Sequence, residues 1–440
     1  MAITDHADVD SDGVKFGPVN LMPGISRGNA FSLMWGAFMT IGLLTFVAVA
    51  TPYVLTVNLG IPEAEQGTIT GDLVFWAEIT QILIFGLVGV AADRIGRNWL
   101  YAMGLLAMGA SYLFYPFAES VGELTIYRVI YAIGLGTSTG MLATVVADYP
   151  RENSRGKMLA LVGFLNGLGV ILFIALLGNL PDILVAAGYT AITAGRYTHA
   201  VAAIGCAVTA LVLGFGLKKG TPVQQEERLP VMELVRSGLR EGRNPRISLA
   251  YASAFVSRGD FVILGTFAIL WGKTFGMSQG MAPAEAMTIG TIVFVTTQTS
   301  ALLWIPVLGV LLDRVNRVTG LSVCMGLATA GYLGTMFVDD PTARSAIPIF
   351  VLLGVGQISA FLGSATLIGQ EAPHAKRGSV VGVFNSCGAI GILVASSIGG
   401  RLFDAIGPSA PFVLVGIFNG MVFLAALVVR VLSPGPMKAR

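Results

Sequence analysis

Ionisable side chains lie inside several long apolar stretches of this sequence, where an unpaired charge is costly. They are Glu78, Arg128, Arg258 and Asp260, together with Asp72, which lies nearer the end of its stretch. Such residues are retained inside apolar segments when they are paired or face a water-filled cavity, and they are typical of proton relays and substrate pathways. We predict that these side chains line a central cavity, where they carry protons or bind a solute.

The sequence allows two roles for each of the two arginines in this set. Arg258 and Asp260 are two residues apart, so their side chains point to different faces of a helix and each needs a partner elsewhere. That partner belongs either to a coupling site or to an interhelical salt bridge that only fixes the packing. Arg128 shares a helical face with Ala132 and Gly136, and such small residues either pack against another helix or line an open cavity.

The residue types of a metal site or a catalytic site do not occur together. The histidines His6, His199 and His374 have no Cys or His at ligand spacing, so we expect no metal site. No nucleophile and base are suitably placed, and no G-x-x-x-x-G-K-[ST] loop is present to bind a nucleotide. We therefore predict that the protein is not an enzyme, needs no cofactor and takes its energy from a proton gradient.

Composition places these residues in a membrane. Charged residues make up 12% of the chain, against about 25% in soluble domains, and apolar residues reach 54%. The apolar runs reach the roughly 20 residues that a helix needs to cross a bilayer, and they lack the alternation of a membrane β-barrel. We predict an all-α integral membrane protein with twelve transmembrane helices. The expected spans are Asn29–Tyr53, Gly71–Ala92, Trp99–Phe117, Gly122–Ala147, Lys157–Leu177, Tyr197–Leu217, Ile247–Trp271, Glu285–Leu312, Thr319–Phe337, Ser345–Gly369, Ser379–Arg401 and Ala410–Leu432.

Basic residues predict the orientation, because Lys and Arg in short loops prefer the cytoplasmic side. When both chain ends and the loops after the even-numbered spans share one side, that side carries nearly all the basic residues. The opposite side holds only Arg196, Lys273, Arg344 and Arg401. Both ends are therefore expected in the cytoplasm.

The spans and the polar stretches between them predict the domain organisation. A polar linker, with a short helix expected over Val231–Arg240, separates two sets of six spans. The expected segments are a cytoplasmic N-terminal tail (1–28), an N-terminal six-helix bundle (29–217), a cytoplasmic linker (218–246), a C-terminal six-helix bundle (247–433) and a C-terminal tail (434–440).

A charged loop is written twice. GVAADRIGRN, from Gly89, returns as GVLLDRVNRV, from Gly309, half of the 440-residue chain further on. ADYPRENSRG after the fourth span is likewise echoed by QEAPHAKRG after the tenth. The counterpart of Glu78 in this repeat is Gln298, which has the same shape without the charge. A parallel repeat of six spans predicts two bundles related by an axis along the membrane normal, with a binding site at their interface.

The first of these loops resembles the signature loop of the major facilitator superfamily. Gly89, Asp93, Arg94, Gly96 and Arg97 stand at the motif positions, and RVIYAIGLG in the fourth span is similar to the helix-four motif of that family. The fifth span departs from it, because GFLNGLGVIL has the glycines of the antiporter motif without its proline. The resemblance covers nearly the whole chain. It implies a twelve-helix secondary transporter that works by alternating access, similar to the drug-antiporter members.

The doubled loops predict a cytoplasmic gate. An Asp at a helix end can accept hydrogen bonds from the start of a neighbouring helix, and an Arg can pair with an acid on the next hairpin. Such contacts can hold the two bundles together at one end and release them; alternatively, these are solvated charges that only set the orientation. The predicted gate residues are Gly89, Asp93, Arg94, Arg97, Asp148, Arg155, Asp313, Arg314, Arg317, Glu371 and Arg377.

The sequence thus favours a proton-coupled secondary transporter of the cell (inner) membrane that exports a small organic or amphipathic molecule. The close alternative is uptake of a small organic solute, including an anionic one, by symport or facilitated diffusion. A transport-inactive membrane sensor or scaffold is a third hypothesis. We expect a monomer whose partners are its small-molecule substrate and the lipid bilayer, with no nucleic acid.

Overall fold

The computed structural model describes residues 14–151, 154–220, 231–373 and 376–434, without the side chains at 85, 86, 89, 90, 93, 231, 232 and 234. This part of the chain is almost entirely α-helical. A short antiparallel hairpin, β1 (Lys15–Phe16) and β2 (Val19–Asn20), precedes the first helix.

The helices fall into two sets that are joined by a short linker helix. Those of the first set are α1 (Arg27–Thr45), α2 (Val47–Val57), α3 (Glu63–Ile95), α4 (Arg97–Phe114), the 3-10 turn η1 (Tyr115–Phe117), α5 (Val121–Asp148), α6 (Arg155–Ala186) and α7 (Ala191–Gly216). The linker helix is α8 (Val231–Glu241). Those of the second set are α9 (Pro245–Ser278), α10 (Pro283–Arg314), α11 (Arg317–Gly334), η3 (Thr335–Phe337), α12 (Ile347–Glu371), α13 (Arg377–Ala405) and α14 (Ala410–Leu432).

Eleven stretches of the described residues are long and apolar enough to cross a membrane. α1 and α2 together form the first of them, Arg27–Val57. The predicted span Gly71–Ala92 lies within α3, a helix of 33 residues that is not among the eleven and whose side chains are only partly described. Several helices are longer than their predicted spans. α6 continues past Leu177 to Ala186, and α9 continues past Trp271 to Ser278.

The two copies of the repeated loop begin their following helix in different ways. Gly96, between α3 and α4, has a φ of +90°, a left-handed conformation that favours glycine. Its counterpart Asn316, between α10 and α11, has a φ of −59°, and its side chain accepts a hydrogen bond from the Val318 backbone N–H at 3.0 Å. The second copy therefore makes the turn with a capping asparagine in place of the glycine.

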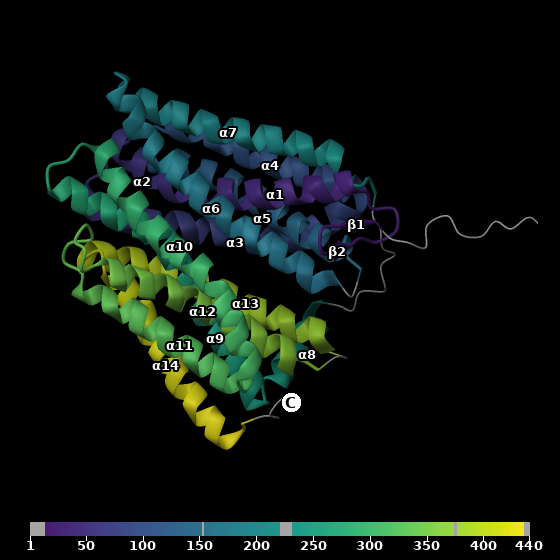
Figure 1. Ribbon diagram of the computed structural model, residues 1–440. Helices are drawn as coiled ribbons and strands as arrows, with labels where there is room; N and C mark the ends of the chain where they lie inside the picture. Colours follow the sequence, from purple (N-terminus) through teal and green to yellow (C-terminus); the bar gives the residue numbers. More distant parts are fainter. Residues whose placement is uncertain (1–13, 152–153, 221–230, 374–375, 435–440) are drawn as a thin grey trace, which may run out of the picture.

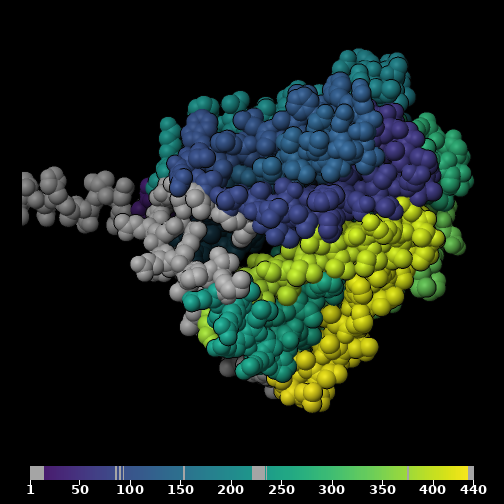
Figure 2. Space-filling model, turned by 180° about the vertical axis from the view of Figure 1, so that it is seen from behind, coloured from purple at the N-terminus to yellow at the C-terminus, as the bar shows by residue number. Residues whose placement is uncertain are grey.

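Figure 1 shows α1–α7 packed together above α9–α14, with α8 beside α13. The two sets meet mainly through α3 against α13 and α6 against α10. We call the end at which α8 lies the linker end, and the opposite end the far end. The sets meet at the far end and spread apart towards the linker end, where Figure 2 shows a hollow between them.

Close backbone contacts hold α3 against α13 at the far end. A Cβ added to Gly71 would lie 2.4 Å from the Ser396 carbonyl oxygen, and one added to Gly400 would lie 2.4 Å from the Gly67 carbonyl oxygen. Only glycine permits this approach, because any side chain there would overlap the facing backbone.

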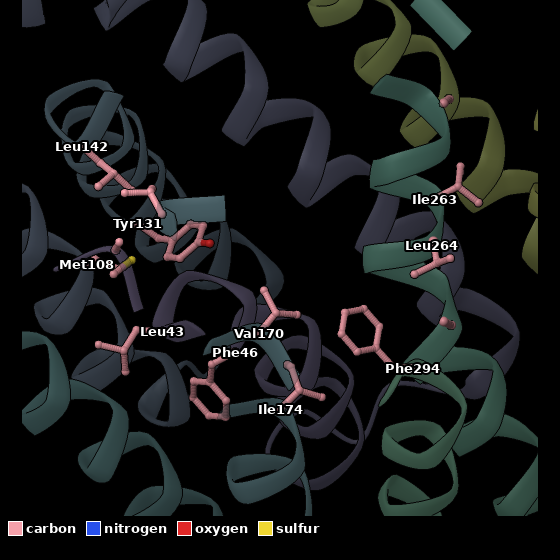
Figure 3. Close-up of a cluster of buried hydrophobic side chains, with 14 of the residues drawn as sticks. Leu43, Phe46, Met108, Tyr131, Leu142, Val170, Ile174, Ile263, Leu264 and Phe294 are labelled. Carbon is pink, nitrogen blue, oxygen red and sulfur yellow. The ribbon is translucent and has the colours of Figure 1, made fainter. Parts of the chain in front are cut away.

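Buried apolar side chains continue across the boundary between the two sets. In Figure 3, Phe294 of α10 points towards Val170 and Ile174 of α6, while Leu43, Phe46 and Met108 fill the interior of the first set. The far half of the boundary is therefore a packed core, in which charged residues are exceptional.

Candidate functional site

Glu78 and Arg258 form a pair of opposite charges across the boundary. Glu78 lies on α3, where its Oε2 accepts a hydrogen bond from Gln81 Nε2 at 3.1 Å. Arg258 lies on α9, with its guanidinium 4.8 Å from the centre of the Phe361 ring of α12. The two charges interact electrostatically, although no ion pair within 4.0 Å joins them among the described residues. This acid and base therefore come from different sets of helices.

Asp260 has a different environment, although it is only two residues from Arg258. It is fully buried, and both carboxyl oxygens accept from Asn419 Nδ2 of α14, at 2.8 and 2.9 Å. The Tyr332 hydroxyl of α11 donates to its backbone carbonyl at 2.9 Å. These partners all belong to the second set, so Asp260 lies inside that set.

Arg128 of α5 is 7% exposed and faces a small enclosed cavity between the two sets. The cavity has a volume of about 30 Å³, and its lining includes Thr51 of α2, Thr70 of α3 and Thr266 of α9. The Arg128 guanidinium lies 4.9 Å from the centre of the Tyr131 ring. Its Nε and Nη1 atoms are buried without a hydrogen-bond partner.

Asp72 lies at the far end, where an ion pair crosses the boundary. Its Oδ1 is 3.1 Å from Nη1 of Arg401 on α13. One turn further along α13, the two carboxyl oxygens of Asp404 accept from the backbone N–H groups of Gly67 and Thr68, at 2.8 and 2.7 Å. These contacts fasten the start of α3 to the end of α13.

Lys273 of α9 is a third polar contact at the far end, and sequence reasoning missed it. Its side chain is fully buried, and its ammonium donates to Thr56 Oγ1 at 2.6 Å and Gln66 Oε1 at 2.5 Å, both in the first set. The predicted span ended at Trp271, so Lys273 was assigned to a loop. The apolar residues of LWGKTFG on both sides of the lysine were the available signal that the helix continues.

At the linker end, Arg97 pairs with Asp148 within the first set. This pairing joins the start of α4 to the end of α5, so a loop arginine pairs here with an acid on the next hairpin. Arg94 is the exposed last basic residue of α3, and Arg155 begins α6. The side chain of Asp93 and the surroundings of Gly89 lie outside the described residues.

The second copy of this arrangement uses a different partner. Glu371 is 3.1 Å from Nε of Arg246 at the start of α9, whereas the repeat suggested a loop arginine, Arg314 or Arg317, as its partner. Asp313 and Arg314 close α10, and Arg317 opens α11. Arg377 opens α13, and its Nη2 donates to the Gly369 carbonyl at 3.3 Å.

Comparison with known proteins gives consistent likenesses. The sequence profile of the Major Facilitator Superfamily matches residues 33–396. The magnetosome protein MamH of Paramagnetospirillum magneticum is 29% identical over 414 residues, which cover 92% of each chain. The crystal structure of the nucleoside transporter NupG superposes with a TM-score of 0.71 at 14% identity, over 92% of this chain and 99% of that one. The D-xylose-proton symporter superposes with a TM-score of 0.64 at 18% identity, over 91% of this chain and 97% of that one.

Proposed function

The chain belongs to the major facilitator superfamily and is a multi-pass membrane transporter, and we propose that it works by alternating access and couples transport to protons. In this proposal the two sets of helices are six-helix bundles, residues 29–217 and 247–433, that rock against each other. The linker 218–246 and both tails lie in the cytoplasm, and the membrane is the cell (inner) membrane.

The observation that carries the proposal is the electrostatic interaction of Glu78 with Arg258 across the boundary. A nearby cation favours the ionised form of a carboxyl, and its removal favours the protonated form. Because the two residues lie on different bundles, rocking changes their separation. Glu78 can therefore take up a proton in one state and release it in the other.

The repeat supports a single proton carrier at this level. Gln298 of α10, the counterpart of Glu78, has a buried side-chain oxygen without a hydrogen-bond partner. The second bundle thus presents a neutral amide where the first presents an acid. We assign Asp260 a structural role in the second bundle, because its hydrogen bonds among the described residues are with α11 and α14.

The contacts of the far end define the state of the transporter. Arg401 with Asp72, and Asp404 with the start of α3, close that end, and Lys273 is buried there against Gln66. With the linker in the cytoplasm, this is an inward-facing state. The ion pair of Arg97 with Asp148, and the other predicted gate residues, then belong to the cytoplasmic gate that closes in the opposite state.

Export of a small organic molecule is our first hypothesis for direction, and uptake of a small organic solute is the alternative. The test begins with a thermal-shift screen of the purified chain, because a ligand that binds the folded state raises its apparent stability. A hit is then added to one side of sealed proteoliposomes that contain a pH-sensitive dye. Substrate-driven proton movement in the direction opposite to the substrate supports export by antiport, and movement in the same direction supports symport. Transport without proton movement contradicts the coupling.

A further inference from the structure

Arg128 is a buried cation. Among the described residues, no carboxylate forms an ion pair with it, and its guanidinium lies over the neutral ring of Tyr131. A cation over an aromatic ring is stabilised by the ring's quadrupole, but this attraction does not replace the hydrogen bonds that a buried guanidinium loses. A buried charge of this kind needs an anion.

A second unsatisfied donor lines the same cavity. The Thr70 hydroxyl of α3 is buried without a hydrogen-bond partner, and Thr70 and Arg128 both belong to the lining of the cavity between the bundles. The Nε–H and Nη1–H bonds of a guanidinium point in different directions, so each can donate a separate charge-assisted hydrogen bond to an oxygen of a carboxylate or phosphate group. The Thr70 hydroxyl, in the lining of the same cavity, can donate to the same group.

The charges of the boundary favour an anion at this place. Towards the far end, Asp72 is neutralised by Arg401, and the oxygens of Asp404 are occupied by two backbone N–H groups. Lys273 is buried with the neutral acceptors Thr56 and Gln66. Glu63 at the start of α3 interacts electrostatically with Lys273. These far-end charges therefore have partners of their own, and Arg128 is the charged residue of the cavity lining.

We propose that Arg128 and Thr70 bind an oxyanion group of the transported solute, a carboxylate or a phosphate, when the far end opens. This assignment rests on the proposed transport function and names the substrate class. In the inward-facing state the cavity of about 30 Å³ has room for about one water molecule, which is less than an oxyanion needs. Opening of the contacts between α3 and α13 widens the cavity and admits the anion.

The test is equilibrium binding to the purified full-length chain in detergent, with inorganic phosphate and succinate as separate probes. The unfolding midpoint is measured against probe concentration at constant ionic strength, with sodium chloride as the balancing salt. We expect a saturable rise with at least one probe, and the responding probe distinguishes a phosphate from a carboxylate. Arg128→Gln should weaken the apparent affinity about ten-fold or more, because a charge-assisted hydrogen bond is lost. Thr70→Val should weaken it several-fold.

Matched variants separate this site from general effects. Arg196→Gln removes an exposed arginine that stacks on Phe117 near the far end, and it should leave the affinity unchanged. Asp404→Asn should tighten binding, because it weakens the closed far end and raises the population of the binding state. If Arg128→Gln does not fold, the response of Thr70→Val decides the question.

Absence of a saturable rise with either probe, or an equal rise in the parent, Arg128→Gln and Thr70→Val, overturns the assignment. Weaker or unchanged binding in Asp404→Asn contradicts entry from the far end. The measurement uses one pH and no gradient, so a failure of proton coupling leaves its result intact, and the two proposals can fail separately.

Discussion

Lys273 of α9 donates a hydrogen bond to Gln66 of α3 across the two bundles, with 2.5 Å between Nζ and Oε1, and its side chain has no exposed surface. Thr56 Oγ1 accepts from the same ammonium, so both partners are neutral. Glu63 of α3 also interacts with this ammonium electrostatically, but burial of an ammonium is costly, and this cost falls when water enters the boundary. Lys273 therefore makes the closed far end easier to open than an apolar contact would.

We expect Lys273→Met to keep the far end closed for a larger fraction of the time, because an apolar side chain of similar length has no charge to hydrate. The measurement is the rate at which a cysteine at Thr266, which lines the Arg128 cavity, reacts with a thiol reagent applied from the far side. The background is a Cys387→Ser chain, since Cys206 and Cys324 are buried. Labelling should slow several-fold. Arg344→Met, at an exposed position of a far-end loop, is the control. Faster labelling in Lys273→Met would contradict this and mean that the ammonium stabilises the closed far end.

The orientation is tested by cysteines at exposed positions of the two ends. Asp340→Cys lies at the far end, and Lys219→Cys lies at the linker end. In intact cells an impermeant thiol reagent should label Asp340→Cys alone, and after permeabilisation it should label both. Labelling of Lys219→Cys in sealed cells would reverse the assignment of the two sides.

Asp260 is predicted to support stability and to leave coupling unaffected. Asp260→Asn keeps an oxygen for Asn419 Nδ2, so gradient-driven transport should persist at close to the parent level. Asp260→Ala removes the acceptor, and we expect the free energy of unfolding to fall by about 1–3 kcal/mol. Unfolding in detergent and proteoliposome transport measure the two effects. Loss of coupling in a stably folded Asp260→Asn chain would mean that this acid takes part in proton coupling.

The cytoplasmic gate is tested at Asp148, the partner of Arg97. Asp148→Asn should reduce the transport rate several-fold and change ligand affinity less. The reason is that the ion pair stabilises one conformational state of the transport cycle and lies at the linker end, far from the bound solute. Glu119→Gln removes an exposed acid at the far end and serves as the control. Equal rates in the two variants would leave Asp148 with only an orienting role.

The helices could be predicted from the sequence, because each apolar run long enough to cross a bilayer can satisfy its backbone only as a helix. The partners of the charged residues could not be predicted from the sequence. Glu371 pairs with Arg246 and not with a loop arginine, and Asp260 meets Asn419 from α14. Such pairings depend on which faces of distant helices meet. Lys273 was missed for a simpler reason. The predicted span ends before this charged residue, whereas α9 continues through it and places it in the boundary between the bundles.

The central claim is that Glu78 carries the coupling proton, and the most direct measurement compares two modes of transport in proteoliposomes. Glu78→Gln resembles the protonated acid, so exchange of labelled for unlabelled substrate should continue, while accumulation driven by an imposed pH gradient should disappear. Glu285→Gln, which removes an acid in the first turn of α10, should behave as the parent in both assays. Undiminished accumulation by Glu78→Gln against the substrate gradient would contradict the account and leave the pair of Glu78 and Arg258 as a packing contact.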